Sequence, residues 1–165
     1  MSDTPTFLFA VRNDLDQEIF TPRRGEPLAT GWDVRAAQFD KKDLILRPGT
    51  YFRIPLGFRA FCPAGWSYEL HPRSSSFAKK GMHTLIGIID ETFPLECQLI
   101  GQYIPDVNSL GKDLVIKFGD PIGQIIPVKR QEMNIELVSN ERIDQLYAER
   151  KAVRVGGVGS TDNNR

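Results

Sequence analysis

Short stretches rich in β-branched and aromatic residues recur along the chain, and Gly, Pro, Asn and Asp separate them. We expect strands at Phe7–Val11, Gly31–Ala37, Tyr51–Phe61, Trp66–Leu70, Leu85–Ile89, Gln98–Ile104, Leu114–Phe118 and Ile122–Val128. Many short strands at such a spacing are typical of a β-sandwich or barrel. The hydrophobic pattern therefore predicts an all-β fold.

Helical patterns are few. Ser74–Lys80 is expected to form a short helix, with serine hydroxyls capping its start and Gly81 ending it. A second helix is expected at Ile143–Lys151, because Ile143, Leu146 and Tyr147 follow the i, i+3, i+4 spacing of a helix face. Asp106–Lys112 has the turn residues of a polar hairpin loop between two strands.

The 165 residues are close to the size of one ordinary domain. We expect a β domain at residues 1–150 and a flexible, glycine-rich C-terminal arm at residues 151–165. The two cysteines, Cys62 and Cys97, form no CxxC pair, and neither His71 nor His83 has a second ligand at metal-finger spacing. Reduced, structural cysteines are the expectation.

The charge balance limits the classes of partner. The 21 basic residues equal the 21 acidic ones, so no overall field draws the chain to nucleic acid or to an anionic membrane. No apolar run approaches the roughly 20 residues that cross a bilayer, and Met1–Thr6 lacks the order of a signal peptide. We expect a soluble, cytoplasmic protein with neither kind of partner, in which any anion is held by a local pocket.

Three segments have the chemistry of a phosphate site. Pro72–Ser76 directly precedes the expected short helix and offers hydroxyls, backbone N–H groups and the Arg73 guanidinium. Gln124 interrupts an apolar run, so its amide needs a partner, which either a phosphate or a backbone carbonyl can supply. Arg154–Thr161 is glycine-rich and contains a cation and hydroxyls, although glycine-rich tails are usually linkers.

Two carboxylates stand at places where they can take part in catalysis. Asp90 ends an apolar strand, where a general base can accept a proton from an attacking water, although an isolated aspartate there more often only starts a turn. Asp33 lies on the polar face of Gly31–Ala37 and can reach the water shell of Mg²⁺ or pair with a neighbouring arginine.

The order and spacing of these groups resemble the sequence motifs of the trimeric dUTPase family, part of the superfamily of dUTP diphosphatases and dCTP deaminases. The matching segments, which span about residues 20 to 161, are Gly31–Ala37, Pro72–Ser75, Gly87–Phe93, Gly119–Gln124 and Arg154–Thr161. The resemblance implies a β jelly-roll that forms a homotrimer. It also implies Mg²⁺-dependent attack of water on the α-phosphorus of dUTP, which yields dUMP and pyrophosphate.

The resemblance also implies roles for individual residues. Asp90 would activate the water, and Asp33 would act through the waters of a Mg²⁺ ion that the substrate phosphates hold. The backbone of Thr84–Asp90 would read uracil, and an aromatic ring would lie beneath the sugar. The substrate-binding residues implied are Arg73, Ser74, Ser75, Thr84, Gly87, Ile89, Phe93, Gln124, Arg154, Gly159, Ser160 and Thr161.

The chain departs from the family pattern at several places. Phe93 stands where the family usually has tyrosine, and Pro94-Leu95-Glu96 replaces a continuation that usually contains glycine. Pro121 replaces an arginine that often pairs with the first aspartate, for which Arg35 or Arg53 is a candidate substitute. Val158 replaces a phenylalanine that stacks on uracil.

Two other functions compete with dUTP hydrolysis. A dCTP deaminase of the same fold needs a glutamate about seven residues after the position of Phe93, where this chain has Ile100, and Glu96 comes too early in the strand. A non-catalytic nucleotide-sensing regulatory protein has no need of a water-activating carboxylate such as Asp90.

Overall fold

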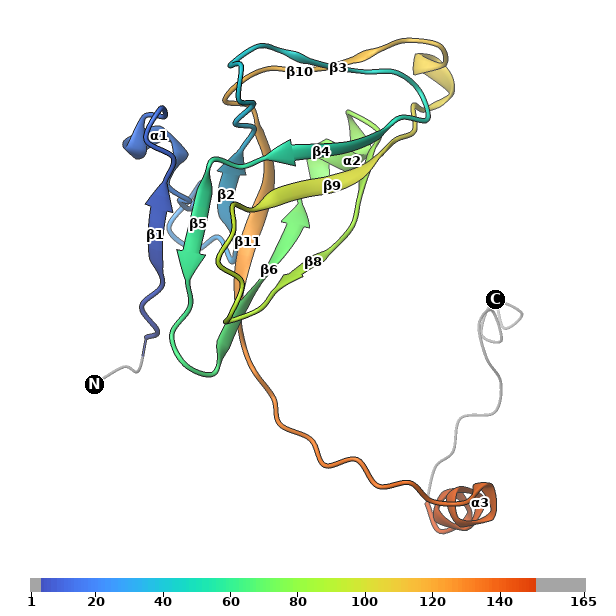
Figure 1. Cartoon of the computed structure of the whole chain (residues 1–165). Coiled ribbons are helices and arrows are strands. Elements are labelled where there is room, and N and C mark those ends of the chain that lie inside the picture. Colours follow the sequence, from blue (N-terminus) through green and yellow to red (C-terminus); the bar gives the residue numbers. More distant parts are fainter. Residues whose placement is uncertain (1–3, 151–165) are drawn as a thin grey trace. The chain divides into compact units, whose positions relative to one another are not determined.

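The structure is a computed structural model that describes residues 4–150, and most of its regular elements are strands (Figure 1). The strands are β1 Leu8–Val11, β2 Trp32–Arg35, β3 Leu44–Leu46, β4 Tyr51–Pro55, β5 Phe58–Phe61, β6 Trp66–Pro72, β7 Met82–Thr84, β8 Gly87–Ile89, β9 Gln98–Tyr103, β10 Leu114–Ile116 and β11 Pro121–Lys129. The helices are α1 Gln17–Phe20, α2 Ser74–Ala78, the 3-10 turn η1 Val107–Ser109 and α3 Asn140–Ala148. The all-β prediction is confirmed.

The strands pair antiparallel in small sheets. The largest has the order β2-β11-β6-β8, and a second has the order β4-β9-β7. Two further pairs, β1-β5 and β10-β3, complete the sheets of the described residues (Figure 1). β11 is the long central strand of the largest sheet, because it pairs with β2 on one side and with β6 on the other.

Alternation along the strands explains where the core lies, because successive side chains of a strand point to opposite faces. In β4, Phe52 and Ile54 are buried, whereas Tyr51 and Arg53 are exposed. The buried faces of the sheets form one apolar core, to which the largest contributors are Phe52, Ile54, Leu56, Phe58, Tyr68, Leu70, Met82, Leu99, Ile116 and Ile122.

Each of the eight predicted strand stretches contains a strand, but the predicted boundaries are wrong in places. Tyr51–Phe61 is divided into β4 and β5 at Gly57, whose φ of 74° is a left-handed backbone conformation that glycine adopts readily. Leu85–Ile89 is regular only from Gly87 onward. The strands β3 and β7, each of 3 residues, and the helix α1, of 4 residues, were not predicted, since such short elements show no period.

The helix after β6 was predicted, but the predicted capping by serine hydroxyls is wrong. Arg73, rather than a serine, is the N-cap of α2, and no side chain caps the helix start by a hydrogen bond. One of the serines, Ser76, is fully buried and donates its hydroxyl hydrogen bond to the carbonyl of Ile122 at 2.9 Å instead. Gly81 follows with φ 62°, as expected for a residue that ends a helix.

The expectation of a hairpin at Asp106–Lys112 is wrong. This segment connects β9 to β10, which belong to different sheets and do not pair with each other. It contains η1, and the carboxylate of Asp106 caps that turn by accepting a hydrogen bond from the Asn108 N–H at 3.0 Å. The turn residues were predicted correctly, but β9 and β10 pair with strands from other parts of the sequence and not with each other.

The chain separates into two compact units, residues 1–130 and residues 131–165. In the described part of the second unit, α3 confirms the predicted helix, and Ser139 caps it by accepting a hydrogen bond from the Arg142 N–H at 3.2 Å. The predicted domain boundary at residue 150 stays a prediction. Among residues 4–150, none of the helices has the length and apolarity needed to cross a membrane.

Candidate functional site

Three side chains from neighbouring parts of the largest sheet meet at one end of it. Asp33 on β2 lies opposite Gln124 of β11 in the strand register. The Asp33 Oδ1 atom is 3.3 Å from Nε of Arg73, the residue that follows β6, and Gln124 Nε2 donates to the carbonyl of Pro72 at 3.2 Å. We call Asp33, Arg73 and Gln124 the polar cluster. In this cluster a cation and an amide lie close together, although they come from two predicted phosphate-binding segments that are far apart in the sequence.

Two further contacts fasten α2 to the start of β11. One is the buried Ser76 hydroxyl, which bonds to Ile122. The other is the ion pair between Lys80 Nζ and Asp120 Oδ2 at 3.1 Å, and the same carboxylate oxygen accepts from the Lys117 N–H at 3.3 Å. Sequence reasoning missed Ser76, Lys80 and Asp120. They hold Arg73 and Gln124 in a fixed relation, although nothing in their local pattern signals it.

Asp33 forms an ion pair although Pro121 replaces the arginine that usually pairs with this aspartate in the family. Its partner is Arg73, and neither of the two arginines considered as substitutes takes the role. Arg35 donates to the carbonyl of Gly119 at 2.8 Å, and Arg53 lies in a different sheet. Asp33 therefore touches the arginine of the phosphate segment, which couples the first and second motifs directly.

A cavity of about 700 Å³ lies against β8, and we call it the β8 cavity. Its volume is in the range of small-molecule sites, about 300–1,000 Å³. Three of the predicted substrate-binding residues, Gly87, Ile89 and Phe93, line it. The other lining residues are Arg53, Leu70, Leu85, Ile86, Ile88, Leu95, Glu96, Cys97, Gln98 and Ile100.

Thr84 ends β7, just before the segment that lines the β8 cavity. Its hydroxyl oxygen is buried and has no hydrogen-bond partner among the described residues. A buried hydroxyl without a partner is costly, by about 1–3 kcal/mol. Thr84 therefore carries a polar atom whose hydrogen-bonding capacity is unused.

Asp90 directly follows β8 and is exposed. Within residues 4–150, its carboxylate has neither a hydrogen bond nor an ion pair, whereas its backbone carbonyl accepts from the Phe93 N–H at 3.0 Å. The adjacent Glu91 holds the turn, since its Oε2 accepts from the Gly65 N–H at 2.9 Å and from Arg130 Nη1 at 3.0 Å. A fixed backbone thus presents a carboxylate that is free to accept a proton.

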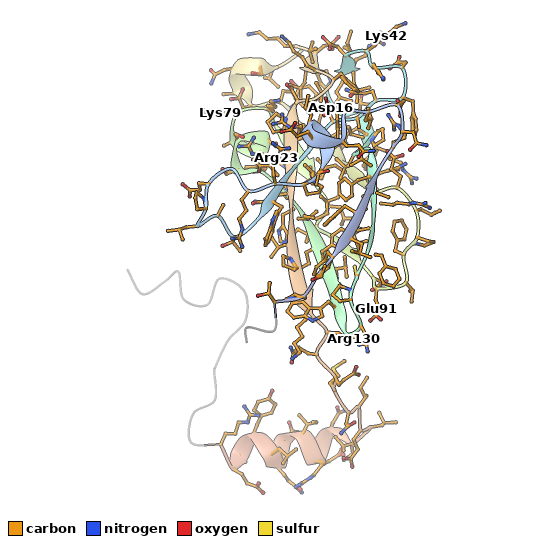
Figure 2. All side chains as sticks on the ribbon, turned by 90° about the vertical axis from the view of Figure 1, so that its left-hand side faces the viewer. Asp16, Arg23, Lys42, Lys79, Glu91 and Arg130 are labelled. Carbon is orange, nitrogen blue, oxygen red and sulfur yellow. The ribbon has the colours of Figure 1, made fainter. Side chains whose placement is uncertain are left out.

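Asp90 and the polar cluster lie at opposite ends of one sheet. The register pairs Ile89 with Tyr68, which places Asp90 beside Ser67, whereas Arg73 follows the other end of β6. At about 3.3 Å per residue, the distance along β6 from Ser67 to Arg73 is about 20 Å. Figure 2 shows Glu91, the neighbour of Asp90, at one end of the β unit and Lys79, at the end of α2, toward the other. The structure therefore does not bring these two groups together within one chain.

The cysteines give no reactive thiol. Both Cys62 and Cys97 are free and buried. Burial raises the pKa of Cys97 from 9.0 to about 11, and burial likewise raises the pKa of Tyr68, whose hydroxyl is 2.7 Å from Cys97 Sγ. Cys97 lines the β8 cavity as a neutral thiol, which is a packing role rather than a nucleophilic one.

The described residues contain no group of three or more His, Cys, Asp or Glu side chains that could hold a metal ion. Mg²⁺ bound to phosphates keeps several waters and needs only one or two carboxylates. Asp33, the acidic member of the polar cluster, fits that requirement, because it stands beside the phosphate-type ligands Arg73 and Gln124. The donor set fits a metal carried by a substrate and not a dedicated protein cage.

Four predicted site residues, Arg154, Gly159, Ser160 and Thr161, lie outside the described residues. Ser74 and Ser75 begin α2, next to Arg73. The roles of all the predicted site residues stay predictions; what the geometry adds is which of them are neighbours.

Comparison with known proteins identifies the family. The dUTPase family matches residues 17–161. The deoxyuridine 5'-triphosphate nucleotidohydrolase of Caulobacter vibrioides is 31% identical over 134 residues, which is 81% of this chain and 79% of that protein.

Solved structures agree on the fold. A dUTPase from Streptococcus mutans superposes with a TM-score of 0.65 at 21% identity, covering 76% of this chain and 98% of that one. A mutant dUTPase from the Staphylococcus aureus phage phi11, described with a structural Mg(II) ion, gives a TM-score of 0.67 at 16% identity, covering 82% and 97%. This chain belongs to the dUTPase family.

Proposed function

We propose that this protein hydrolyses dUTP to dUMP and pyrophosphate. Membership of the dUTPase family supports the reaction. The observation that carries it is the β8 cavity, because Asp90, whose carboxylate has no partner among the described residues, directly follows Ile89 of the cavity wall. A nucleoside in this cavity has a candidate general base beside it.

The cavity suits the nucleoside part of the substrate. Backbone groups of Thr84–Asp90 would read the uracil ring, since Leu85–Ile89 line the cavity. Phe93 lines the same cavity, so its ring can lie beneath the deoxyribose, where close packing would leave little room for a ribose 2′-hydroxyl. The loss of the usual tyrosine hydroxyl leaves this packing role intact.

The polar cluster suits the phosphates. Phosphate oxygens accept hydrogen bonds from guanidinium, hydroxyl and amide groups. The cluster and its neighbours supply all three, from Arg73, from Ser74 and Ser75, and from Gln124. The Gln124 amide keeps one N–H beyond the hydrogen bond that it makes to Pro72. From the undescribed arm, Arg154, Gly159, Ser160 and Thr161 would add further donors.

We further propose that the working protein is a homotrimer whose sites combine different chains. The support is the distance of about 20 Å along β6 that separates Asp90 from Arg73 within one chain. A second support is that apolar residues of the β8 cavity wall are exposed, with Ile86 at 54%, Ile88 at 69% and Leu95 at 64%, so that a neighbouring chain can cover them around the ligand. Exposed apolar patches of this kind mark protein interfaces.

The chemistry follows from these positions. Asp90 would accept a proton from a water while the oxygen of that water attacks the α-phosphorus. The bond between the α-phosphorus and the bridging oxygen then breaks, and the electron pair leaves with pyrophosphate. Arg73 and Gln124 would balance the charge that develops on the phosphates, which is the main source of phosphoryl-transfer catalysis. Bound Mg²⁺, with Asp33 beside its waters, would neutralise further phosphate charge.

The geometry disfavours a dCTP deaminase. Ile100 lines the β8 cavity at the position where a deaminase needs its glutamate. Glu96 also lines the cavity, but its Oε1 accepts hydrogen bonds from the Gly57 N–H at 2.9 Å and from Arg12 Nη1 at 3.1 Å. A carboxylate held in this way is a structural tether and not a general acid at the base ring.

A substrate panel tests the proposal. Pyrophosphate and ammonia release would be measured from dUTP, dTTP, dCTP and UTP, each with and without Mg²⁺. We expect pyrophosphate release from dUTP that depends on Mg²⁺, with little from UTP. Ammonia released from dCTP without pyrophosphate would instead identify a deaminase.

The variant Asp90→Asn tests the proposed base and separates an enzyme from a nucleotide sensor. Removing the proton acceptor should lower kcat by about 10²–10⁴-fold. The affinity for dUTP and the unfolding midpoint should stay close to the wild-type values, because the carboxylate makes no contact with the described residues that folding needs. Unchanged turnover would refute the role of Asp90.

A further inference from the structure

Arg53 is a cation in the wall of the β8 cavity to which the family motifs assign no role. The alternation of β4 buries Phe52 and Ile54 and turns Arg53 outward, and the register places it opposite Ile100 of β9, which also lines the cavity. Within residues 4–150, the Arg53 side chain takes part in no hydrogen bond and no ion pair. It therefore offers free donors to whatever occupies the cavity.

The surroundings make those donors effective. Ile86, Ile88 and Ile100 line the cavity together with Arg53. The acidic residue of the same wall, Glu96, has an oxygen engaged by Arg12 and Gly57. A nucleoside that packs on these apolar side chains displaces their water, and a hydrogen bond is stronger where water is excluded, so the bond that it accepts from Arg53 is strengthened by the same packing.

The position of Arg53 in the cavity determines which part of the ligand Arg53 contacts. Arg73 and Gln124, the proposed phosphate ligands, lie at the end of the largest sheet and do not line this cavity. Arg53 instead shares the cavity with Phe93 and with Leu85–Ile89, which is the wall proposed for the sugar and the base. The group that meets Arg53 therefore belongs to the nucleoside and not to the triphosphate.

We propose that Arg53 is a specificity-determining residue that donates a hydrogen bond to the 4-oxo group of the uracil ring. A guanidinium has only donors, so it pairs with the 4-oxo group of uracil and is mismatched with the 4-amino group of cytosine. A site built to donate to one group rejects an analogue that lacks the acceptor. This inference rests on the proposed hydrolysis of dUTP and adds a side chain to the recognition of its base.

The test compares two nucleotides in three proteins. The KM of dUTP and the inhibition constant of dCTP would be measured for the wild type, for Arg53→Met and for Arg53→Lys. We expect Arg53→Met to raise the KM of dUTP by about 10- to 100-fold, the range for a hydrogen bond to a charged group, and to change the dCTP constant by less than about 3-fold. Arg53→Lys keeps a donor and should lie between the other two.

Arg59→Met is the matched control. Arg59 is an exposed strand arginine on β5, outside the lining of the β8 cavity, so its variant should keep the wild-type constants for both nucleotides. An equal loss for dUTP and dCTP in Arg53→Met would assign Arg53 to a group that both nucleotides share, such as the phosphates or the 2-oxo group, and would overturn the proposal. The absence of any loss would overturn it as well.

Binding of the free nucleosides separates this inference from the proposed reaction. Calorimetry with deoxyuridine and deoxycytidine needs neither turnover nor phosphates. If the wild type prefers deoxyuridine and Arg53→Met abolishes the preference, Arg53 reads the base even in a protein that fails to hydrolyse dUTP. An unchanged preference in Arg53→Met would overturn the role of Arg53 and leave the proposed hydrolysis standing.

Discussion

At the scale of single residues, the position of the Gln124 amide depends on the missing side chain of Gly31. A Cβ at residue 31 would collide with Gln124 Oε1 and would come within 2.9 Å of Gln124 Cδ. The end of a glutamine side chain can swing away, so Gly31→Ala should displace the amide and leave the fold intact. We expect the KM of dUTP to rise by about 10-fold or more while the free energy of unfolding changes by less than about 1 kcal/mol.

Gly101→Ala is the contrasting control. Its Cβ would collide with the carbonyl oxygen of His83 and come within 2.9 Å of Thr84 Cα, and backbone atoms cannot swing away. This variant should lose about 2 kcal/mol or more of stability in urea denaturation. If Gly31→Ala loses as much stability as Gly101→Ala, its effect on KM is a folding effect and the argument for Gln124 fails.

Cys97 makes the stability of the protein depend on pH. Burial raises the pKa of this thiol from 9.0 to about 11, so between these values the native state keeps a proton that the unfolded chain releases. The stabilisation is therefore complete below about pH 9 and declines by roughly 2–3 kcal/mol as pH rises through the window.

The variant Cys97→Ala checks this assignment. Urea denaturation at about pH 8 and about pH 10 should show a smaller decline for Cys97→Ala than for the wild type, because the titrating group is gone. Groups that do not contact Cys97 titrate in both proteins and cancel in the difference. Equal declines would show that Cys97 carries none of the pH dependence.

At the scale of elements, a tether holds the segment between β8 and β9 against the turn between β4 and β5. Cys97 exchanges backbone hydrogen bonds with Leu56 and Phe58, each at 3.0 Å, and Glu96 accepts from the Gly57 N–H. Arg12 completes the tether, since it bonds to Glu96 and to the carbonyl of Ala37 at 3.0 Å. The segment Pro94-Leu95-Glu96, unusual for the family, is thus fixed by its glutamate.

Removing the Glu96 carboxylate should affect the stability of the protein and the binding of dUTP more than the rate of the chemical step. Glu96→Ala leaves the Gly57 N–H and Arg12 without their acceptor, so we expect a loss of about 1–3 kcal/mol of stability and a rise in the KM of dUTP. The kcat should change little, because Asp90 belongs to a separate turn. Glu96→Gln keeps an acceptor oxygen and should restore most of the KM; a Gln variant as impaired as the Ala variant would contradict the tether.

The elements that the sequence predicted are those with a clear local signal. Clusters of β-branched and aromatic residues between turn residues located the stretches of the long strands β6, β9 and β11, and the i, i+3, i+4 spacing located α3. Elements of three residues, such as β3 and β7, are too short to show a period and exist because partner strands hold them. The same limit explains the wrong hairpin at Asp106–Lys112, since strand pairing is a tertiary property.

The candidate site was predictable as separate segments and not as an arrangement. Turn residues and strand ends pointed to Asp90, Arg73 and Gln124 from their local sequence. The pairing of Asp33 with Arg73 arises from the sheet order β2-β11-β6, which no local pattern contains. Ser76 is a similar case, because its hydroxyl acts on a carbonyl that lies 46 positions away.

At the scale of the whole molecule, the two parts of the proposed site lie apart within one chain. The end of the largest sheet next to α2 carries the polar cluster, and Asp90 follows β8 at the other end. Alternating apolar residues beyond β11 are also open: Met133 is 79%, Ile135 84% and Leu137 97% exposed. Alternation is the pattern of a strand that buries one face, so these residues suit contact with another copy.

The division into halves gives a test by mixing two inactive proteins. Asp90→Asn lacks the proposed base, and Arg73→Ala lacks the phosphate cation, so each variant alone should be nearly inactive. If a site takes its base from one chain and its cation from another, randomly mixed trimers should restore about a quarter of the wild-type sites, since each intact half is present with a chance of about one half. Co-refolding equal amounts, confirming mixed trimers by native mass spectrometry and measuring pyrophosphate release from dUTP would check this. A mixture as inactive as its components would mean that base and cation belong to the same chain, and the proposed assembly would be wrong.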